Sequence, residues 1–466
     1  MLFRLTLCGL LLSFLLPASE WNRLRGPNGE GVADDAPLPT NLAESLLWRQ
    51  VLPQGKSSPA LTKDRIFVTA HKNGELLTLS LDRATGRELW RRVAPSRRIE
   101  KMNRLNDEAS SSPVSDGSDV FVFFGGYGLL AYGPDGEELW RRPMGPFTNF
   151  HGMAASPVLH GDKLLMVCDQ DHDAYVIALN KTDGSVAWRV ERPEMVHSFS
   201  TPALYEPADG PVELIVPGSY QMVSYDVASG RELWRLRALT YQVKSMPVIA
   251  GNRLYFNGWA PGGEPAVRLV LPPFTEALKL HDADGDGALA KAEVPQEWQP
   301  GNWDMQDLNK NGSFDERDWQ YYSQRRTSTN SAMAVRLGGR GDVTESHLIW
   351  RHAKSLPDVP AILLYDDVVY LIKNGGILTT LDPATGSIHK QGRVRDAIDS
   401  YYASPVAGDG KVYLASEKGK VAVLSAGPDP QPLSAHDLGE PIYATPALSA
   451  GRIYLRTSEA LYCFGR

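Results

Sequence analysis

Cysteine and long apolar runs are scarce in this sequence, and each scarcity excludes a class of protein. The 466 residues include three cysteines, too few for a scaffold held together by disulfides. After the first 20 residues, no stretch approaches the ~18 apolar residues that a membrane-spanning helix needs. The net charge of −7 arises from acidic and basic residues mixed along the chain, which gives no support for nucleic-acid binding.

The N-terminus is the one strongly apolar part of the chain. Met-Leu-Phe-Arg is followed by an apolar run from Leu5 to Leu16, and then by small residues at Ala18 and Ser19. This order is typical of a secretory signal peptide, so we expect residues 1–19 to be removed by cleavage near Ala18 or Ser19. A membrane anchor is the weaker interpretation, because the run is about half the length needed to span a bilayer. The sequence predicts an extracytoplasmic protein, periplasmic or secreted, without a transmembrane segment.

A short signature ending in proline recurs along the rest of the chain. Its eight copies are Ser58-Pro59, Ser112-Pro113, Ser156-Pro157, Thr201-Pro202, Met246-Pro247, Val359-Pro360, Ser404-Pro405 and Thr445-Pro446. The prolines are 54, 44, 45, 45, 113, 45 and 41 residues apart. A repeat of this length indicates an array of supersecondary units that must pack against one another to bury their apolar faces.

Most units also end in a turn followed by tryptophan. The clearest copies span residues 81–90, 133–140, 180–188 and 225–234, and residues 381–386 repeat the turn. In Asp82-Arg-Ala-Thr85-Gly86, the Asp side chain caps the turn and Gly supplies the left-handed position. A Leu-Trp pair follows, and Trp90 offers a large area to pack between neighbouring units.

The ends of the chain indicate how the array closes. Residues 45–49 form a lone strand that contains Trp48, whereas the last unit ends at residues 460–464 without a Trp strand of its own. We therefore expect an all-β, eight-bladed β-propeller in which the first strand completes the last blade, over residues 44–261 and 331–466, after an extended segment at 20–43. Closure removes the two open sheet edges. Cys168 and Cys463 fall in blades three and eight, so we expect two free, buried thiols.

The repeated Asp-x-x-Thr-Gly-x-x-x-Trp ending resembles the pyrroloquinoline-quinone (PQQ) type propeller repeat. That group includes quinoprotein dehydrogenases and the non-enzymatic outer-membrane-assembly propellers of the BamB kind. The opening Trp21-Asn-Arg-Leu-Arg25-Gly26-Pro27-Asn28-Gly29 also resembles the start of secreted bacterial members. The resemblance indicates a fold more strongly than a function. Quinoprotein dehydrogenases of this fold usually carry an adjacent Cys-Cys pair over the quinone, which this chain lacks, so we do not expect PQQ to bind.

The one long interval between prolines contains a sequence typical of a calcium loop. Residues 262–330 are predicted to be a small α-helical EF-hand insertion in blade five, with helices at 274–280 and 317–322. The first loop offers Asp282, Asp284, Asp286, the Ala288 carbonyl and Glu293 as ligands, and Gly287 permits its sharp bend. The second offers Asp307, Asn309, Asn311, Ser313 and Asp318, where Asp in place of the usual last Glu predicts weaker binding. The alternative is a solvated, Asp-rich segment without metal.

Polar residues precede the innermost strands and are expected to surround one mouth of the central channel. They are Lys56, Asn106, Asp107, Glu108, His151, His197, Lys244, Asp399, Tyr402 and Tyr443. Such convergence is what a binding site for a protein or small molecule needs, although a solvated rim is the alternative. His151 and His197 could share a metal with Asp107 or Glu108. The insertion, placed between the second and third strands of blade five, is expected beside this mouth rather than splayed outward.

These features favour a non-catalytic binding or scaffold protein with Ca²⁺ as its cofactor. The sequence contains no Cys-x-x-Cys-His haem segment, Gly-x-Ser-x-Gly elbow or His-Glu-x-x-His helix. Two enzymatic alternatives stay open: a quinoprotein oxidoreductase with an atypical site, and a hydrolase or lyase that uses the polar mouth.

Overall fold

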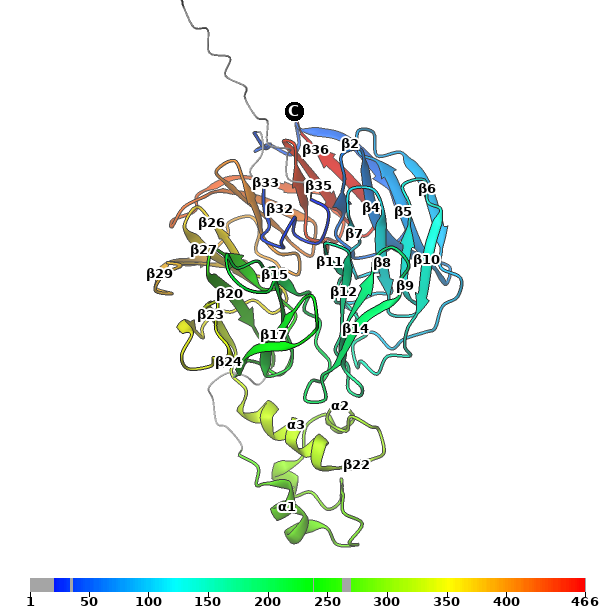
Figure 1. The fold of residues 1–466 in the computed structure, drawn as a ribbon. Coiled ribbons are helices and arrows are strands. Elements are labelled where there is room, and N and C mark those ends of the chain that lie inside the picture. The colour runs from blue at the N-terminus through cyan, green and yellow to red at the C-terminus, as the bar shows by residue number, and fades with distance from the viewer. Residues whose placement is uncertain (1–20, 34–36, 238, 262–269, 466) are drawn as a thin grey trace, which may run out of the picture.

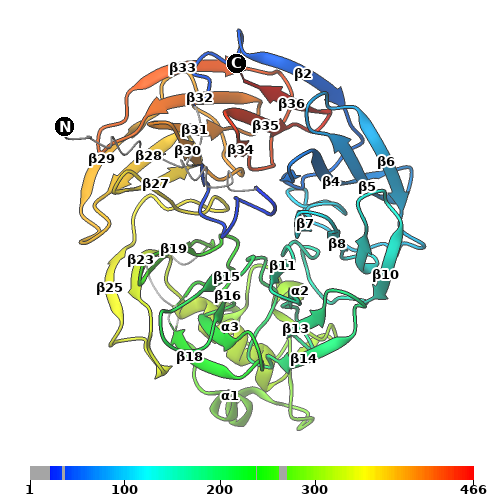
Figure 2. The same cartoon turned by 45° about the horizontal axis from the view of Figure 1, so that its top comes forward.

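Eight antiparallel sheets surround a central channel like the blades of a propeller, as Figure 2 shows. The computed structural model describes residues 21–33, 37–237, 239–261 and 270–465. The expected signal peptide lies outside the described residues. In the described part of the chain, no helix is long and apolar enough to cross a membrane.

Blades one to four follow one another along the chain. They contain β3 (Ala60–Leu61), β4 (Arg65–Lys72), β5 (Glu75–Asp82) and β6 (Glu88–Val93); β7 (Val114–Ser115), β8 (Val120–Phe124), β9 (Gly128–Tyr132) and β10 (Glu138–Pro143); β11 (Val158–His160), β12 (Lys163–Cys168), β13 (Tyr175–Asn180) and β14 (Val186–Glu191); and β15 (Ala203–Tyr205), β16 (Glu213–Pro217), β17 (Gln221–Asp226) and β18 (Glu232–Arg237). In each blade the first strand lies innermost, beside the channel, and the last lies on the perimeter (Figure 2).

Blades five to eight complete the ring. They contain β19 (Val248–Ala250), β20 (Arg253–Gly258), β23 (Ser331–Arg336) and β25 (Leu348–His352); β26 (Leu363–Tyr365), β27 (Val368–Lys373), β28 (Ile377–Leu381) and β29 (Ile388–Arg393); β30 (Val406–Gly408), β31 (Lys411–Ala415), β32 (Lys420–Ser425) and β33 (Pro432–Asp437); and β34 (Ala447–Ser449), β35 (Arg452–Arg456), β36 (Ala460–Phe464) and β2 (Leu46–Val51). Two short strands add to the ring: β24 (Gly341–Asp342) beside β18, and β1 (Val32–Ala33) beside β30.

The prediction that the first strand closes the ring is confirmed. β2 pairs antiparallel with β36, and Trp48 stands opposite Cys463. Cys168 and Cys463 are free and buried, as the distance between blades three and eight requires. The fold is therefore the expected eight-bladed propeller, closed by the two ends of the chain.

Where the repeated Trp is present, it packs its blade against the next. The indole N–H of Trp90, Trp140, Trp188 and Trp350 donates to a turn carbonyl of the following blade at 2.7–3.0 Å. The ring of Trp90 also covers Gly136, where an added Cβ would lie 2.8 Å from the indole. Gly136 has φ of 81°, so this turn needs glycine for its backbone as well as for the close approach of the tryptophan.

The Ser/Thr-Pro signature also has a structural reason. In most blades the hydroxyl before the proline accepts a hydrogen bond from the backbone N–H at the same position of the preceding blade. Ser58 N donates to Ser112 Oγ at 2.9 Å, Ser112 N to Ser156 Oγ at 2.9 Å, and Ser156 N to Thr201 Oγ1 at 3.0 Å. The series resumes where Ser404 N donates to Thr445 Oγ1 and Thr445 N to Ser58 Oγ, whereas Ser404 Oγ accepts from Ala361 N, two residues beyond the signature position of blade six. This belt is interrupted beside blade five, where Met246 and Val359 carry no hydroxyl.

Replacement of Ser112 by Ala is expected to lower the free energy of unfolding by about 1–3 kcal/mol, because the buried N–H of Ser58 loses its acceptor. Ser112→Thr keeps the hydroxyl and should restore most of the loss, since Thr201 and Thr445 already serve the belt. Urea denaturation of both variants, with the exposed Ser118→Ala as control, measures the effect. Equal stability of Ser112→Ala and the control would contradict this role for the belt.

The N-terminal segment crosses the centre of the ring, which the sequence did not predict (Figure 2). Its contacts with inner strands of different blades are Trp21 O with Leu61 N (2.7 Å), Asn22 Nδ2 with Ser115 O (2.9 Å), Asn28 Nδ2 with Leu204 O (2.9 Å), and Arg25 with Ile362 O (2.8 Å). Trp21, Arg23 and Arg25 are buried. Burial lowers the pKa of Arg25 to about 9. Residues 21–33 therefore close the channel from within.

The helical part of the chain lies between β20 and β23, the second and third strands of blade five. It contains α1 (Phe274–His281), β21 (Leu289–Ala290), the 3₁₀ helix η1 (Gln296–Trp298), α2 (Trp303–Gln306), β22 (Ser313–Phe314) and α3 (Glu316–Thr327). Figure 1 shows this insertion projecting from one face of the propeller. It has its own small core, in which the rings of Trp303 and Phe314 stack with centroids 3.9 Å apart.

Candidate functional site

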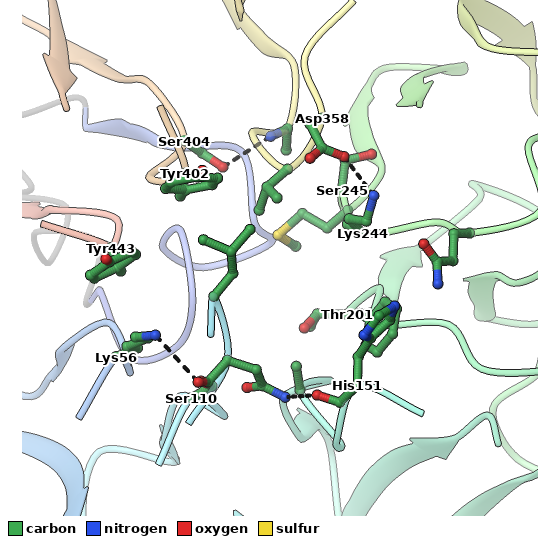
Figure 3. A pocket seen from close by; sticks show the side chains of 18 of the residues that line it. Lys56, Ser110, His151, Thr201, Lys244, Ser245, Asp358, Tyr402, Ser404 and Tyr443 are labelled. Carbon is green, nitrogen blue, oxygen red and sulfur yellow. Dashed lines mark hydrogen bonds and ion pairs between the residues drawn. The ribbon is translucent and has the colours of Figure 1, made fainter. Parts of the chain in front are cut away.

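A cavity of about 490 Å³ opens at one end of the channel. Loops of most blades line it, and side chains from opposite sides of the ring face one another across it (Figure 3). Of the residues predicted from sequence, the lining includes Lys56, Asn106, His151, Lys244, Tyr402 and Tyr443. Others were missed: Leu24 and Arg25 from the N-terminal segment, Phe199, Gln242, Trp259 and Asp358 from the blades, and Met305 and Arg325 from the insertion.

Lys56 and two tyrosines form one side of the cavity. The Lys56 ammonium donates to the backbone carbonyls of Arg104 at 2.8 Å and Asn106 at 3.3 Å. It also lies 4.3 Å from the ring centroid of Tyr443, which stacks with Tyr402 at 5.8 Å. Burial lowers the pKa of Lys56, partly offset by the nearby Asp107 carboxylate. This side therefore offers a fixed cation beside two aromatic faces.

Lys244 occupies the opposite side (Figure 3). Its ammonium lies 2.5 Å from Asp358 Oδ1 and 3.3 Å from the Trp259 carbonyl. Among the described lining residues, Asp358 is the one acidic side chain, against the cations of Arg25, Lys56, Lys244 and Arg325. The cavity thus has an excess of positive charge.

His151 lies between these two sides but carries no charge near neutral pH. Burial lowers its pKa to about 4, and the neighbouring His197 and Lys244 act in the same direction. Its Nδ1 lies 3.4 Å from Asn103 Nδ2, and its carbonyl accepts from Asn106 Nδ2 at 3.0 Å. A neutral imidazole held this way offers a hydrogen bond to a ligand rather than a charge.

The other predicted mouth residues do not line the cavity. His197 is fully buried and pairs through Nδ1 with Asp171. Asp107 and Glu108 face His71, and Glu108 also pairs with Arg97. Asp399 accepts the backbone N–H groups of Ser400 and Lys418.

These placements separate the residues that were expected to share a metal. In the described part of the chain, His151, His197, Asp107 and Glu108 do not belong to any group of carboxylates and imidazoles close enough together to bind a metal ion. Alignment on the prolines located the loops correctly. It could not show that Asp171, from another loop, draws the His197 ring into the protein interior.

The insertion contacts the propeller through one face of α3 and through Met305 and Leu308, which precede that helix. Arg317 lies 2.8 Å from His172 Nδ1, and the Tyr321 hydroxyl lies 3.4 Å from His197 Nε2. One turn further, the Arg325 guanidinium lies 4.2 Å from the ring centroid of Tyr241 and reaches the cavity. The insertion therefore sits beside the mouth, against blades three and four, instead of splaying outward.

The two acidic loops of the insertion fold alike. In each, the Asp at position 1 accepts the N–H of the Gly at position 6, and the carboxylate at position 12 accepts the N–H at position 2. These bonds join Gly287 N to Asp282 (3.1 Å), Gly312 N to Asp307 (2.8 Å), Ala283 N to Glu293 (2.9 Å) and Leu308 N to Asp318 (2.8 Å). The position-8 residues, Leu289 and Phe314, pair across β21 and β22.

In the first loop the ligand atoms are already gathered. One oxygen each from Asp282, Asp284 and Glu293 lie within 4.8 Å of one another. A calcium ion that takes oxygens at about 2.3–2.6 Å fits between atoms so spaced. The second loop has two carboxylates, Asp307 and Asp318, and otherwise neutral oxygens from Asn309, Asn311 and Ser313.

The fold is shared with proteins of different function. BamB from Moraxella catarrhalis superposes with a TM-score of 0.57 and 12% identity, over 91% of this chain and 99% of that chain. A europium-containing methanol dehydrogenase gives 0.60 and 10%, over 96% and 98%. Quinohemoprotein alcohol dehydrogenase from Comamonas testosteroni gives 0.57 and 11%, over 96% and 80%. At these identities the likeness concerns the fold alone.

Sequence comparison is more specific. None of the curated proteins matches the chain significantly. A family model described as outer membrane protein assembly factor BamB, however, matches residues 42–171, 172–266 and 339–466. These segments include seven blades in full and blade five without β23, and they leave out most of the insertion. The chain therefore belongs to the family of the outer membrane protein assembly factor BamB.

Proposed function

We propose that this protein acts outside the cytoplasm as a non-catalytic binding propeller, with a ligand at the channel mouth and a calcium-binding EF-hand pair beside it. The observation that carries the proposal is that the polar groups in the cavity are held in place by hydrogen bonds and ion pairs. Lys56, Lys244 and Asn106 are each held by backbone or carboxylate partners, and His151 is neutral. Such groups are arranged to hold a ligand, and the excess of cations favours an anionic one, either a small molecule or part of a protein.

Ser110 and its neighbours in the described part of the cavity do not form the arrangement that a serine hydrolase needs. Ser110 lines it, but its hydroxyl donates to Asp107 Oδ1 at 3.2 Å. His71 lies on the far side of that carboxylate, with Nε2 3.8 Å from Oδ2. A serine nucleophile needs the imidazole between the hydroxyl and the carboxylate, so this order does not activate Ser110.

The oxidoreductase alternative rests on the shared fold, and a spectrum separates it from the proposal. The two described cysteines are buried and lie in different blades, so they do not form the adjacent pair of quinoprotein dehydrogenases. We expect no shift in the absorbance spectrum when PQQ is added with Ca²⁺ to the purified protein. A saturable spectral shift that is lost in Lys56→Ala would contradict the proposed binding function and favour the oxidoreductase alternative.

The calcium part of the proposal is supported by the matching hydrogen bonds of the two loops and by the gathered oxygens of the first. Asp282, Asp284, Asp286, Glu293 and the Ala288 carbonyl would hold one ion. The second loop would hold another through Asp307, Asn309, Asn311, Asp318 and the Ser313 carbonyl. Bound calcium would offset the repulsion among these oxygens. Because the core of the insertion is small, calcium binding would also stabilise its fold.

Isothermal titration of the mature protein should show at least one Ca²⁺ site, with a dissociation constant of about 10⁻³ M or tighter. Asp282→Ala should abolish binding to the first loop, because the position-1 carboxylate both ligates the ion and orders the loop. Glu297→Gln removes an acidic side chain of the insertion outside both loops and should leave the titration unchanged. The absence of heat at millimolar Ca²⁺ would refute the calcium sites while leaving the cavity proposal standing.

A further inference from the structure

Blade six departs from the packing that seals blades one to five against their neighbours. In blades one to five, two alternate residues of the outer strand face the next blade, and both are large. They are Trp90 and Arg92, Trp140 and Arg142, Trp188 and Val190, Trp234 and Leu236, and Trp350 and His352. In β29 the same positions hold Lys390 and Gly392, as the register shows: Lys390 stands opposite Thr380 just as Trp90 stands opposite Ser80. Blade seven departs from this packing too, with Ser434 and His436 at the two positions, but there Ser434 Oγ donates to the Thr40 carbonyl of the N-terminal segment.

The two replacements leave a cavity of about 200 Å³ between blades six and seven. Leu378, Leu424, Pro430 and Pro432 form its apolar part, and Lys390, Arg393 and Arg395 also line it. A Cβ added at Gly392 would meet no atom within 4 Å. Lys390 reaches across the gap to pair with Asp429 on blade seven, but its thin chain leaves part of the space unfilled. The space that an indole fills in blades one to five is therefore partly open at the perimeter of the ring.

The strand beside this cavity is uncovered. β29 is the outermost strand of its sheet, and all six of its residues are exposed. In the described part of the chain no further strand pairs with it. An exposed strand edge presents backbone groups to which another extended segment can hydrogen-bond.

Blade four shows what such a segment looks like when this chain supplies it. There β24 lies parallel to β18, and Val343 N donates to Arg235 O at 2.9 Å. Val343 is buried in the cluster that contains Trp234 and Leu236, and the Asp342 carboxylate lies 3.1 Å from Arg237 Nε. The added strand thus places an apolar residue against the next blade and an acidic residue on an arginine.

The outer strand of blade six, β29, resembles β18, the strand with which β24 pairs in blade four. Arg393 follows Lys390 by three positions, as Arg237 follows Trp234, so the two arginines share a register. Gly392 replaces Leu236, which enlarges the space where the added apolar side chain would pack. Arg395, Arg393 and Lys390 are close to the cavity, and Asp429 is the carboxylate that pairs with one of them.

We infer that β29 and the cavity beside it form a docking site for an extended, acidic segment of another protein. The segment pairs with the outer edge of β29, its carboxylates meet Arg393 and Arg395, and one large apolar side chain enters the cavity. This site lies at the perimeter and is independent of the function proposed for the channel mouth.

Fluorescence anisotropy of a labelled peptide tests the site on the mature chain. The probe is Gly-Glu-Gly-Asp-Trp-Thr-Glu-Ser, blocked at both ends, which follows residues 339–346 with Glu for the Arg and Trp for the Val. It should bind saturably below about 1 mM. Replacement of its Trp by Ala, or of its acidic residues by Lys, should weaken binding at least about tenfold.

Two variants of the protein locate the binding. Lys390→Trp with Gly392→Leu fills the cavity with the side chains of blade four, and it should weaken binding at least about tenfold without lowering the melting temperature. Arg393→Glu alters only the exposed edge and should have a similar effect. Arg141→Glu, on the exposed outer strand of blade two, is the matched control and should leave binding within about twofold of the wild type.

Three outcomes of the peptide experiments would overturn the inference. They are the absence of saturable binding, binding that survives both β29 variants, and equal binding of the peptide with Lys in place of its acidic residues. Sedimentation of the unliganded protein tests a second copy of the chain as the occupant. Dimers that the cavity-filling variant abolishes would assign the site to self-association and would also overturn the docking of an acidic segment.

Discussion

Replacement of Asp169 by Ala is expected to destabilise this propeller by about 3–5 kcal/mol, among the largest effects of any single substitution. Asp169 forms two bonds with Arg192, at 2.7 and 3.1 Å, and both side chains are at most 1% exposed. The carboxylate also accepts from Ser198 Oγ at 2.7 Å. Its charge raises the pKa of Arg192 against the opposing effect of burial. Removal of Asp169 leaves a buried cation with Tyr225 as a remaining partner.

Urea or guanidinium denaturation of Asp169→Ala measures this loss, and two comparisons interpret it. Glu138→Ala removes one partner of the exposed pair with Arg141 and should cost at most about 1 kcal/mol. The double variant Asp169→Leu with Arg192→Leu removes both buried charges and should recover much of the stability. If Asp169→Ala and Glu138→Ala were equally stable, the buried pair would not be structurally important.

Removal of calcium by a chelator is expected to destabilise the folded insertion and, through its contacts, to lower the protection of amides at the channel mouth. Asp318, the last proposed ligand of the second loop, lies in the first turn of α3, and the same helix carries Tyr321 and Arg325 to the propeller. We expect amide exchange in residues 274–327 to accelerate at least about tenfold when calcium is removed, because the insertion has few buried residues of its own. Amides near His197 and Lys244 should also lose protection.

Hydrogen exchange with and without Ca²⁺ separates coupling from a merely local effect. Tyr321→Ala with Arg325→Ala removes the contacts of α3 with His197 and Tyr241 and leaves both loops intact, so the response of the channel mouth to calcium should be weakened. Changes restricted to residues 274–325 in the wild-type protein would rule out coupling to the mouth. Protection gained at both places would make the cavity responsive to the surrounding calcium concentration.

The sequence predicted the parts of the fold that are encoded locally. Eight X-Pro signatures and the Asp-x-x-Thr-Gly turns gave the number of blades, and the unpaired strand with Trp48 gave the closure. The site was only partly predictable. Arg25, Asp358 and Arg325 reach the cavity from three distant segments, and no local pattern links them.

The sequence also could not predict which side chains of these loops face the cavity. Lys244 lies three residues before its proline and His197 five before its own, and Lys244 lines the cavity whereas His197 does not. The difference arises from Asp171 and Tyr321, which hold the imidazole in the interior. Neither partner could be assigned to His197 before the loop and the insertion were seen together.

The N-terminal segment has a consequence for how the protein is made. Residues 21–33 and β2 leave the ribosome first, yet they pair with β30 and β36, which leave it last. Until synthesis ends, the early part of the chain has no partner for these strands, and blade eight cannot exist. Contacts that span almost the whole chain also slow folding, because their loop-closure entropy is lost before they form. A chain truncated anywhere before residue 460 would therefore remain an open arc with free edges, prone to aggregation and visible to quality-control proteases.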